Sequence, residues 1–300
     1  MEELLKTEDL TKRYGRQTVV RGISLSVRKG DIYGFVGKNG AGKTTFLRMV
    51  LGLTRPSSGC VELFGGEKRA KAGRRIGSLV ESPALFRNMS AKDNLELLCD
   101  SLKEDRAQVP EILHTVGLEK TGRKKAGDFS LGMKQRLGLG IALIGNPELL
   151  LLDEPINGLD PTGIVEVRQL LLRLQEQGKT IFISSHILGE LEKISTRYGI
   201  IADGRLVEEL TAQELSEKCQ SGTELKVSDV ARAQEVLSEL CTAERVTVGP
   251  GNRLLVTGEV EDVGLLTSRL HESGVMVKSI RQTEGDAEGY FIAKMEGKTP

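Results

Sequence analysis

The chain has 300 residues, of which 39% are hydrophobic and 28% charged, which is enough for one large α/β domain and a small appendage. Lysine plus arginine and aspartate plus glutamate both number 42, so the charge balance gives no reason to expect nucleic acid or an anionic membrane as the main partner. Uninterrupted apolar runs such as Leu149–Leu152 fall far short of the ~20 residues that span a bilayer, and the acidic amino terminus does not resemble a signal peptide.

About the first 70 residues alternate between strands and glycine-containing turns. Thr18–Val27 and Asp31–Val36 are rich in apolar and β-branched residues, which is typical of strands. A glycine-rich turn follows the second of these segments, and Thr44–Leu53 then has the pattern of a helix. This part of the chain therefore predicts a β-rich region that leads into a strand, a turn and a helix.

The middle of the chain is helical and then returns to buried strands. Ser90 and Asp93 have the spacing of a capping box, which predicts a helix beginning there. Leu149–Leu152 and Thr180–Ser184 are short apolar strands, separated by a helix at Gly163–Gln177 that Asp160 caps. This strand–helix–strand order predicts a parallel sheet.

Composition changes near Lys218–Gly222, where we place a domain boundary. Beyond it the expected order is β-α-β-β-α-β, which is consistent with a small split-βαβ domain. The expected elements are strand Glu224–Val227, helix Ala231–Leu240, strands Arg245–Val248 and Arg253–Thr257, helix Val263–Ser273 and strand Val275–Arg281.

One segment fits the phosphate-binding pattern G-x-x-x-x-G-K-[ST]. Its glycines let backbone N–H groups point inward at phosphate oxygens, and the positive end of the following helix adds to that field. We expect Lys43 to contact the β- and γ-phosphates and the Thr44 hydroxyl to bind Mg²⁺. The expected nucleotide-binding residues are Gly37, Lys38, Asn39, Gly40, Ala41, Gly42, Lys43, Thr44 and Thr45.

Two acidic residues, Asp153 and Glu154, follow directly after the apolar strand Leu149–Leu152. Ligands bind at that end of an open parallel sheet. We expect Asp153 to hold Mg²⁺ and Glu154 to polarise the attacking water beside the γ-phosphate. An apolar strand ending in acidic residues is weak evidence alone, and the phosphate loop earlier in the chain makes the functional interpretation the stronger one.

The sequence between the phosphate loop and the acidic pair resembles a family signature. Phe129–Arg136 is similar to the L-S-G-G-Q run of ABC transporter ATP-binding subunits, although Phe129, Leu131 and Met133 depart from it. The resemblance covers about residues 4–215. It implies that Ser130 and Gly132 touch the γ-phosphate of an ATP held by a second subunit, while Ser130 also caps its own helix.

The same resemblance assigns three further sites. Tyr14 lies where the family stacks an aromatic ring on adenine, Asn157–Asp160 resembles the loop that links the two ATP sites, and His186 resembles the switch histidine. Glu81 stands where the family usually has glutamine, and we expect it to contribute an oxygen to Mg²⁺, provided that the added charge is compensated. A glutamate at this position and Ser-Leu-Gly-Met in the signature are features that resemble the bacitracin-resistance and lantibiotic-immunity branch of the family. Gly289–Ile292 also resembles the end of the accessory domain found in that branch.

These observations predict an α/β fold of the P-loop NTPase type. It would have a parallel-sheet core, an amino-terminal antiparallel β subdomain, a helical subdomain at about residues 82–145, and a small α+β domain at residues 220–300 after the ATP-binding domain of residues 1–219. The resemblance implies an ATPase that uses ATP and Mg²⁺, with Lys43, Glu154 and His186 catalytic and Thr44, Glu81 and Asp153 at the metal.

The resemblance also implies partners and a location. The expected partners are an integral membrane permease that exports a peptide antibiotic or similar amphipathic substrate, and a second ATP-binding subunit, identical or homologous. The chain would lie peripherally on the cytoplasmic face of the cell membrane, with no nucleic acid bound. The alternative is a soluble ABC ATPase acting on nucleic acid or the ribosome, which usually carries a long coiled coil or two cassettes.

Overall fold

The computed structural model describes residues 2–219, 222–240, 246–249, 251–257, 263–283 and 287–297. The chain forms two compact units, the first made of Met1–Ala212 with Phe291–Pro300 and the second of Gln213–Tyr290. The sequence analysis placed the boundary at residues 219/220, where composition changes. The two compact units instead divide between Ala212 and Gln213, at the beginning of the helix that precedes the change in composition.

A six-stranded sheet forms the centre of the first unit, in the order β5-β6-β7-β3-β8-β9. The first five strands pair in parallel and β9 pairs antiparallel to β8, which confirms the predicted parallel sheet. Every residue of β3, β6 and β7 is buried, as expected for strands covered on both faces. The strands are β3 (Ile32–Val36), β5 (Ile76–Leu79), β6 (Leu149–Asp153), β7 (Thr180–Ser185), β8 (Arg197–Ala202) and β9 (Arg205–Thr211).

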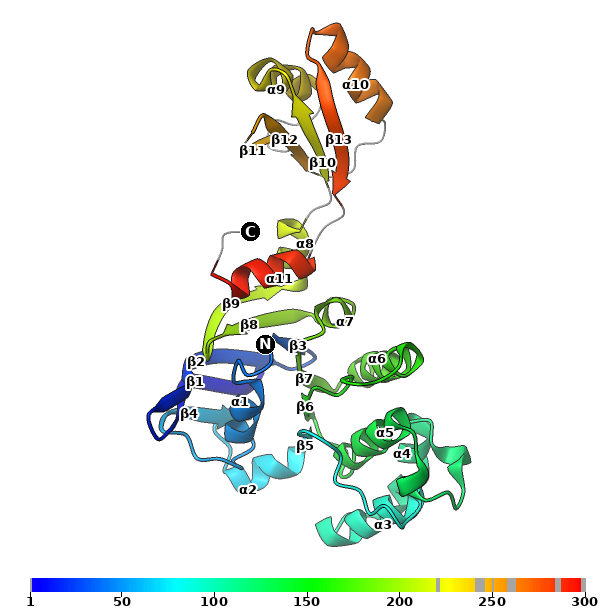
Figure 1. The fold of residues 1–300 in the computed structure, drawn as a ribbon. Coiled ribbons are helices and arrows are strands. Elements are labelled where there is room, and N and C mark those ends of the chain that lie inside the picture. Colours follow the sequence, from blue (N-terminus) through cyan, green and yellow to red (C-terminus); the bar gives the residue numbers. More distant parts are fainter. Residues whose placement is uncertain are drawn as a thin grey trace. The chain divides into compact units, whose positions relative to one another are not determined.

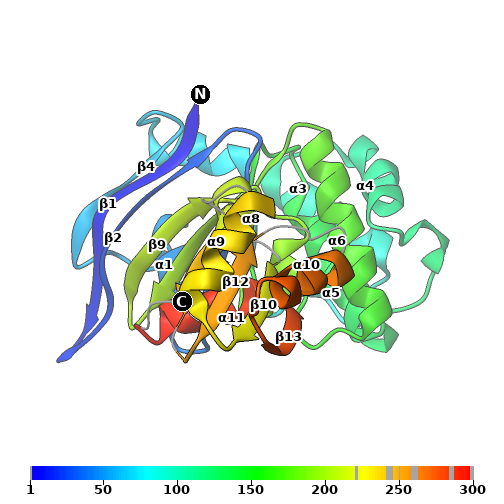
Figure 2. The same ribbon diagram turned by 90° about the horizontal axis from the view of Figure 1, so that it is seen from above.

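An antiparallel sheet and a group of helices lie on opposite sides of this central sheet, as Figures 1 and 2 both show. The antiparallel sheet has the order β2-β1-β4, formed by β1 (Glu3–Tyr14), β2 (Gln17–Arg28) and β4 (Ser58–Leu63). Helix α1 (Lys43–Val50) packs between the two sheets, where the ring of Phe46 lies 5.0 Å from Phe35 and 5.7 Å from Phe182. These ring contacts hold the beginning of α1 at the end of β3.

The helices on the other side come from the segment between β5 and β6 and from the segment after β6. Ser90 forms the predicted capping box with Asp93, and Asp160 accepts a hydrogen bond from the Gly163 N–H at 3.1 Å, so both predicted caps are confirmed. A short helix α2 (Arg69–Ala72) precedes β5. The remaining helices of this unit are α3 (Ala91–Leu102), α4 (Val109–Thr115), α5 (Leu131–Ala142), α6 (Pro161–Glu176) and α7 (Leu188–Glu192).

The second unit has the predicted β-α-β-β-α-β order, with an antiparallel sheet in the order β11-β12-β10-β13. Leu225, Leu237, Leu254 and Leu270 are fully buried in its core. Arg245, the first residue of one predicted strand, lies outside the described residues. After α8 (Ala212–Lys218) the elements are β10 (Gly222–Val227), α9 (Val230–Leu240), β11 (Val246–Gly249), β12 (Arg253–Thr257), α10 (Val263–Glu272) and β13 (Val277–Thr283).

The last helix of the described residues, α11 (Ala287–Met295), was not predicted by the sequence analysis. Its residues from Phe291 onward belong to the first unit, whereas the sequence analysis assigned Gly289–Ile292 to the end of the accessory domain. Phe291 is fully buried, with its ring 5.5 Å from that of Tyr198 on β8. Across the described ranges, no helix is both long and apolar enough to cross a bilayer.

Candidate active site

The predicted phosphate loop connects β3 to α1 at the carboxyl end of the parallel strands. Gly37 is packed so closely that a Cβ there would lie 2.6 Å from the backbone oxygen of Ile201. Gly42 precedes the first residue of α1 with a φ of 108°, a backbone conformation that side chains rarely adopt. Thr44 and Thr45 follow in the first turn of α1, whose N–H groups have no intrahelical acceptors. These N–H groups and the helix dipole suit an anion.

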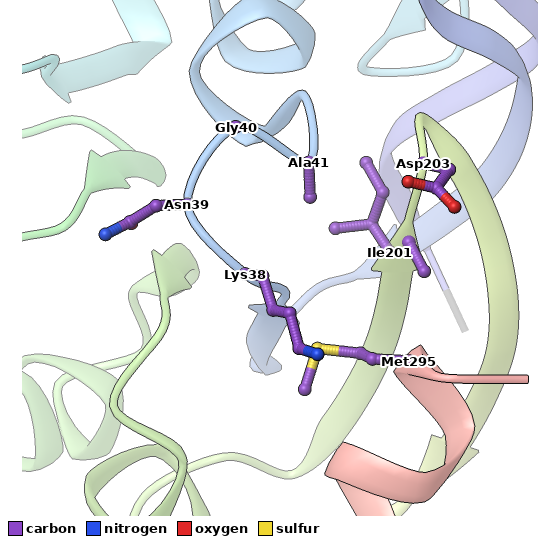
Figure 3. Close-up of a pocket in the computed structure, with 8 residues that line it drawn as sticks. Lys38, Asn39, Gly40, Ala41, Ile201, Asp203 and Met295 are labelled. Atoms are coloured by element: carbon purple, nitrogen blue, oxygen red, sulfur yellow. The ribbon is translucent and has the colours of Figure 1, made fainter. Parts of the chain in front are cut away.

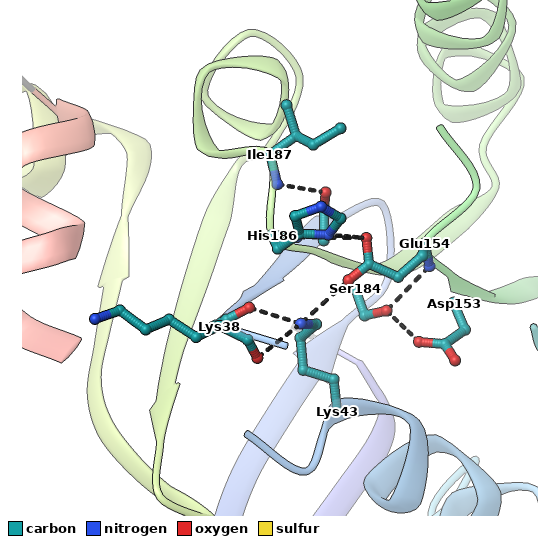
Figure 4. Close-up of polar contacts among 9 residues, drawn as sticks. Lys38, Lys43, Asp153, Glu154, Ser184, His186 and Ile187 are labelled. Atoms are coloured by element: carbon teal, nitrogen blue, oxygen red, sulfur yellow. Dashed lines mark hydrogen bonds and ion pairs between the residues drawn. The ribbon is translucent and has the colours of Figure 1, made fainter. Parts of the chain in front are cut away.

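The Lys43 side chain is nearly buried and its ammonium group is surrounded by oxygen atoms (Figure 4). Nζ donates to the Gly37 carbonyl at 2.6 Å and to the Lys38 carbonyl at 3.3 Å, and it lies 3.1 Å from Oε1 of Glu154. Only 5% of the Lys43 side chain and 18% of the Glu154 side chain are exposed, so water screens this ion pair weakly. The lysine charge is therefore directed into the space that the loop encloses.

Glu154 and His186 form the second contact of the site. Nδ1 of His186 lies 2.8 Å from Oε2 of Glu154, and the His186 backbone N–H donates to the same oxygen at 3.4 Å. Glu154 has a φ of 48°, an uncommon conformation for a residue with a side chain, and its own N–H is held by the Ser184 carbonyl at 3.1 Å. The ends of two neighbouring strands, β6 and β7, thus fix the glutamate between a lysine and a histidine.

Ser184 is a site residue that the sequence analysis missed. Its hydroxyl donates to Oδ1 of Asp153 at 2.5 Å and accepts a hydrogen bond from the Glu154 N–H at 3.1 Å. The available signal was its position at the end of an apolar strand, two residues before His186. Because Ser184 orients Asp153 and holds Glu154, it links the expected metal ligand to the expected base.

The donor set fits Mg·ATP. Hydroxyl and carboxylate oxygens, such as those of Thr44 and Asp153, are the ligands that Mg²⁺ prefers, and Mg²⁺ usually takes only one or two of them together with phosphate oxygens. Glu154 Oε1 is buried without a hydrogen-bond partner, although it lies within ion-pair distance of Lys43. That oxygen is held by the Lys43 ammonium and becomes available to water only when the lysine turns to another acceptor.

Glu81 and Tyr14 do not contact Lys43, Glu154 or His186 but interact with basic side chains elsewhere. Glu81 has a φ of 62°, and its Oε1 lies 2.5 Å from the guanidinium of Arg48 on α1, so a charge that could compensate the glutamate is present. Tyr14, at the end of β1, is 48% exposed, and the Lys12 ammonium lies 4.9 Å from its ring centroid. An exposed ring at this position is available for stacking.

The signature residues begin α5, in the helical group between β5 and β6. The Ser130 hydroxyl accepts a hydrogen bond from the Met133 N–H at 3.2 Å, which confirms it as a helix cap. No described contact joins Ser130 or Gly132 to the phosphate loop of the same chain. Asn157 donates its N–H to the Glu154 carbonyl at 3.1 Å, so the Asn157–Asp160 loop leaves the site directly from the glutamate.

A phosphate loop at the end of a buried strand, with a lysine and an acidic pair aligned beside it, defines a nucleotide hydrolase of the P-loop class. Comparisons with known proteins narrow this class. Residues 20–157 match the ABC transporter family. The chain is 41% identical over its whole length to the bacitracin transport ATP-binding protein BcrA of Bacillus licheniformis, covering 99% of that protein. It is also 41% identical to the lantibiotic transport ATP-binding protein SrtF of Streptococcus pyogenes, over 68% of this chain and 89% of the relative.

Solved structures agree with these relatives. A structure of the ATP-binding subunit of an ABC transporter superposes with a TM-score of 0.64 at 27% identity, covering 72% of this chain and 92% of the other. An ATP-binding cassette in a dimeric post-hydrolysis state bound to ADP and Pi has a TM-score of 0.63 at 25% identity, covering 70% and 99%. The chain belongs to the ATP-binding proteins of ABC transporters, and it is an ATPase that powers transport.

Proposed function

We propose that two ATP-binding subunits, two copies of this chain or one copy and a homologue, close around two Mg·ATP and thereby drive a separate membrane permease that exports a peptide antibiotic or similar amphipathic substrate. The observation that carries the proposal is the placement of Glu154 between Lys43 and His186, at 3.1 and 2.8 Å. Phosphoryl transfer to water needs a positioned acceptor and charge neutralisation rather than covalent participation by the protein. This arrangement supplies both.

Each side chain of the site has a distinct task in the proposed reaction. The Lys43 ammonium exchanges the Glu154 carboxylate for phosphate oxygens, and the released Oε1 accepts a proton from the attacking water. His186 keeps the glutamate oriented through Oε2 and contacts the γ-phosphate. Asp153 and the Thr44 hydroxyl would hold Mg²⁺, and Glu81 would contribute an oxygen if its carboxylate left Arg48. The ion would supply neutralisation of phosphate charge.

Tyr14 and the outer part of the phosphate loop bind the rest of the nucleotide. Tyr14 stacks on adenine, which its exposed ring permits. Backbone N–H groups of Lys38–Thr45 surround the phosphates, as expected at a helix amino terminus.

Ser130 and Gly132 act on the ATP of the partner subunit. Two observations support this. Ser130 lies at the amino terminus of α5, a helix of twelve residues, and its hydroxyl accepts a hydrogen bond from the Met133 N–H of the same helix. A phosphate oxygen can take the place of the hydroxyl at the first-turn N–H groups.

Complementation between two inactive variants tests this arrangement in a homodimer. Lys43→Ala removes the loop lysine and Ser130→Ala removes the signature hydroxyl, so we expect each variant alone to hydrolyse ATP slowly. In a mixed dimer, one site combines an intact Lys43 with the partner's intact Ser130, and ATPase activity returns. If the variants exchange subunits and the ATPase activity of the mixture is still only the sum of their separate activities, action across the dimer is refuted.

The export of peptide antibiotics is supported by full-length relatives. In addition to BcrA of Bacillus licheniformis, the bacitracin transport ATP-binding protein BcrA of Enterococcus faecalis is 42% identical over 99% of this chain. None of these comparisons favours an ATPase that acts on nucleic acid. We place the protein on the cytoplasmic face of the cell membrane, bound to the permease.

Copurification distinguishes transport from the alternative function. Tagged protein should retain a polytopic membrane protein, and cells that express both should tolerate a higher concentration of a peptide antibiotic than cells carrying the Glu154→Gln variant. Recovery of nucleic acid or ribosomes, with no membrane protein and no change in tolerance, would contradict the proposal.

A further inference from the structure

The carboxyl-terminal segment Phe291–Gly297 packs against the same loop that binds phosphate. Beyond the buried Phe291, Lys294 Nζ lies 3.2 Å from the Glu208 carboxylate on β9. Residues from Phe291 onward group with the first unit, although the residues directly before them group with the second. The end of the chain is thus fixed to the ATP-binding unit by an aromatic contact and an ion pair.

Beyond these anchors, the segment reaches Lys38 in the phosphate loop. Oε1 of Glu296 lies 3.2 Å from Nζ of Lys38, across 258 residues of sequence. Met295 and Lys38 also line a cavity of about 210 Å³, together with Ala41 and Asp203 (Figure 3). The terminal segment therefore contacts the Lys38 side chain, whereas the Gly37 and Lys38 carbonyls of the same loop face Lys43.

The two lysines of the loop point in different directions. Figure 4 shows the Lys38 side chain extending away from the group formed by Lys43, Glu154 and His186. The Lys38 backbone carbonyl nevertheless accepts a hydrogen bond from Lys43 Nζ at 3.3 Å, so the residue is part of the site through its backbone. The position of the Lys38 side chain decides whether its positive charge adds to that of Lys43.

We infer that Glu296 is a positioning residue that holds the Lys38 ammonium away from the bound nucleotide and so weakens the binding of ATP. The inference rests on Mg·ATP binding at the proposed site. Glu296 also places its own negative charge near an anionic ligand. Both effects have the same sign, because releasing Lys38 and removing Glu296 each make the potential at the phosphates more positive.

The expected change in the affinity for Mg·ATP follows from the solvent exposure of the Lys38 and Glu296 side chains. Lys38 and Glu296 are 57% and 36% exposed, so their interaction is that of a screened surface pair. We expect Glu296→Gln to lower the dissociation constant of Mg·ATP about 1.5- to 5-fold at low salt, with KM falling and kcat little changed. The difference should shrink as salt increases.

The test compares five variants by displacement of a fluorescent ADP analogue and by steady-state ATPase assays. They are Glu296→Gln, Glu296→Asp, Glu176→Gln, Lys38→Gln and the double variant Lys38→Gln/Glu296→Gln. Glu296→Asp should restore the wild-type affinity. Glu176→Gln removes the same charge from the exposed end of α6, beside the opposite ends of the strands, and should change nothing. In a Lys38→Gln background, Glu296→Gln should have a clearly smaller effect, because the group it restrains is gone.

A purely structural role for Glu296 predicts the opposite sign. Loss of packing would lower the melting temperature and weaken nucleotide binding or leave it unchanged. Unchanged or weaker binding by Glu296→Gln, or an equal gain with and without Lys38, would overturn the inference. Failure of the wild-type protein to bind Mg·ATP in the same assay would instead refute the proposed function.

Discussion

Replacement of Glu154 by glutamine removes the proposed acceptor of the water proton while keeping the shape of the side chain. The amide can still accept the His186 N–H, which now reaches Oε2 at 3.4 Å, and it fits beside Lys43. Loss of a general base typically costs about 10²- to 10⁴-fold in rate, so we expect kcat to fall by that factor. This corresponds to about 2.7–5.4 kcal/mol of activation free energy.

Nucleotide binding should respond in the opposite direction. In the structure the Glu154 carboxylate competes for the lysine that the phosphates need, and neutral glutamine competes less. We therefore expect the variant to bind Mg·ATP at least as tightly as the wild-type protein, and to accumulate as an ATP-bound dimer. Phosphate-release kinetics measure the first effect, and nucleotide displacement with size-exclusion chromatography measures the second.

A matched control separates chemistry from general damage. Glu190 on α7 is as exposed as Glu154, at 18%, and its carboxylate pairs with Arg168 at 2.6 Å. Glu190→Gln removes a comparable ion pair outside the proposed site and should retain kcat. If Glu154→Gln hydrolyses ATP within tenfold of the wild-type rate, the base role is wrong, whatever the affinity for nucleotide.

Two further predictions concern the supports of the site. Ser184→Ala should raise the Mg²⁺ concentration needed for half-maximal ATPase activity, because Asp153 loses a buried hydrogen bond worth about 1 kcal/mol; a Mg²⁺ titration identical to the wild type would contradict this. Hydrogen bonding to Arg75 lowers the pKa of Glu148 in the folded protein below its ordinary value of 4.5. The ionised carboxylate therefore stabilises the fold at pH values above 4.5, and this stabilisation is lost as the pH falls through the lowered pKa. Glu148→Gln should therefore be less stable than wild type by up to about 1 kcal/mol at neutral pH, and a urea denaturation difference that persists undiminished at about pH 3 would refute the assignment.

The features that sequence could predict are local. The helix caps at Ser90 and Asp160 depend on residues three positions apart, and both form as expected. The phosphate loop is a contiguous pattern whose glycines are required by backbone geometry, as at Gly42. Its pairing with Asp153 and Glu154 needed only one further rule, that neighbouring parallel strands end at the same edge of the sheet.

The features that sequence could not predict depend on contacts between distant segments. The sequence analysis made no strand prediction for Arg197–Thr211, and the parallel partner of β8 is the distant strand β3, where Tyr33 lies beside Arg197. Glu81, which pairs with Arg48 on α1, has a positive φ that its residue type does not signal. Nothing in the local pattern of the last residues indicates that they return to the phosphate loop.

The contacts of Lys43 connect the binding of nucleotide to the readiness of the site for hydrolysis. Its ammonium has three donors, and the Gly37 carbonyl, the Lys38 carbonyl and Glu154 provide three acceptors. A phosphate oxygen can therefore be bound only when one of these acceptors is released. The carbonyls are fixed by the loop backbone, whereas Glu154 is a side chain whose other oxygen is already held by His186. In the proposed reaction Glu154 is therefore the acceptor that is displaced, and the exchange that binds the phosphate would free the oxygen that we propose activates water.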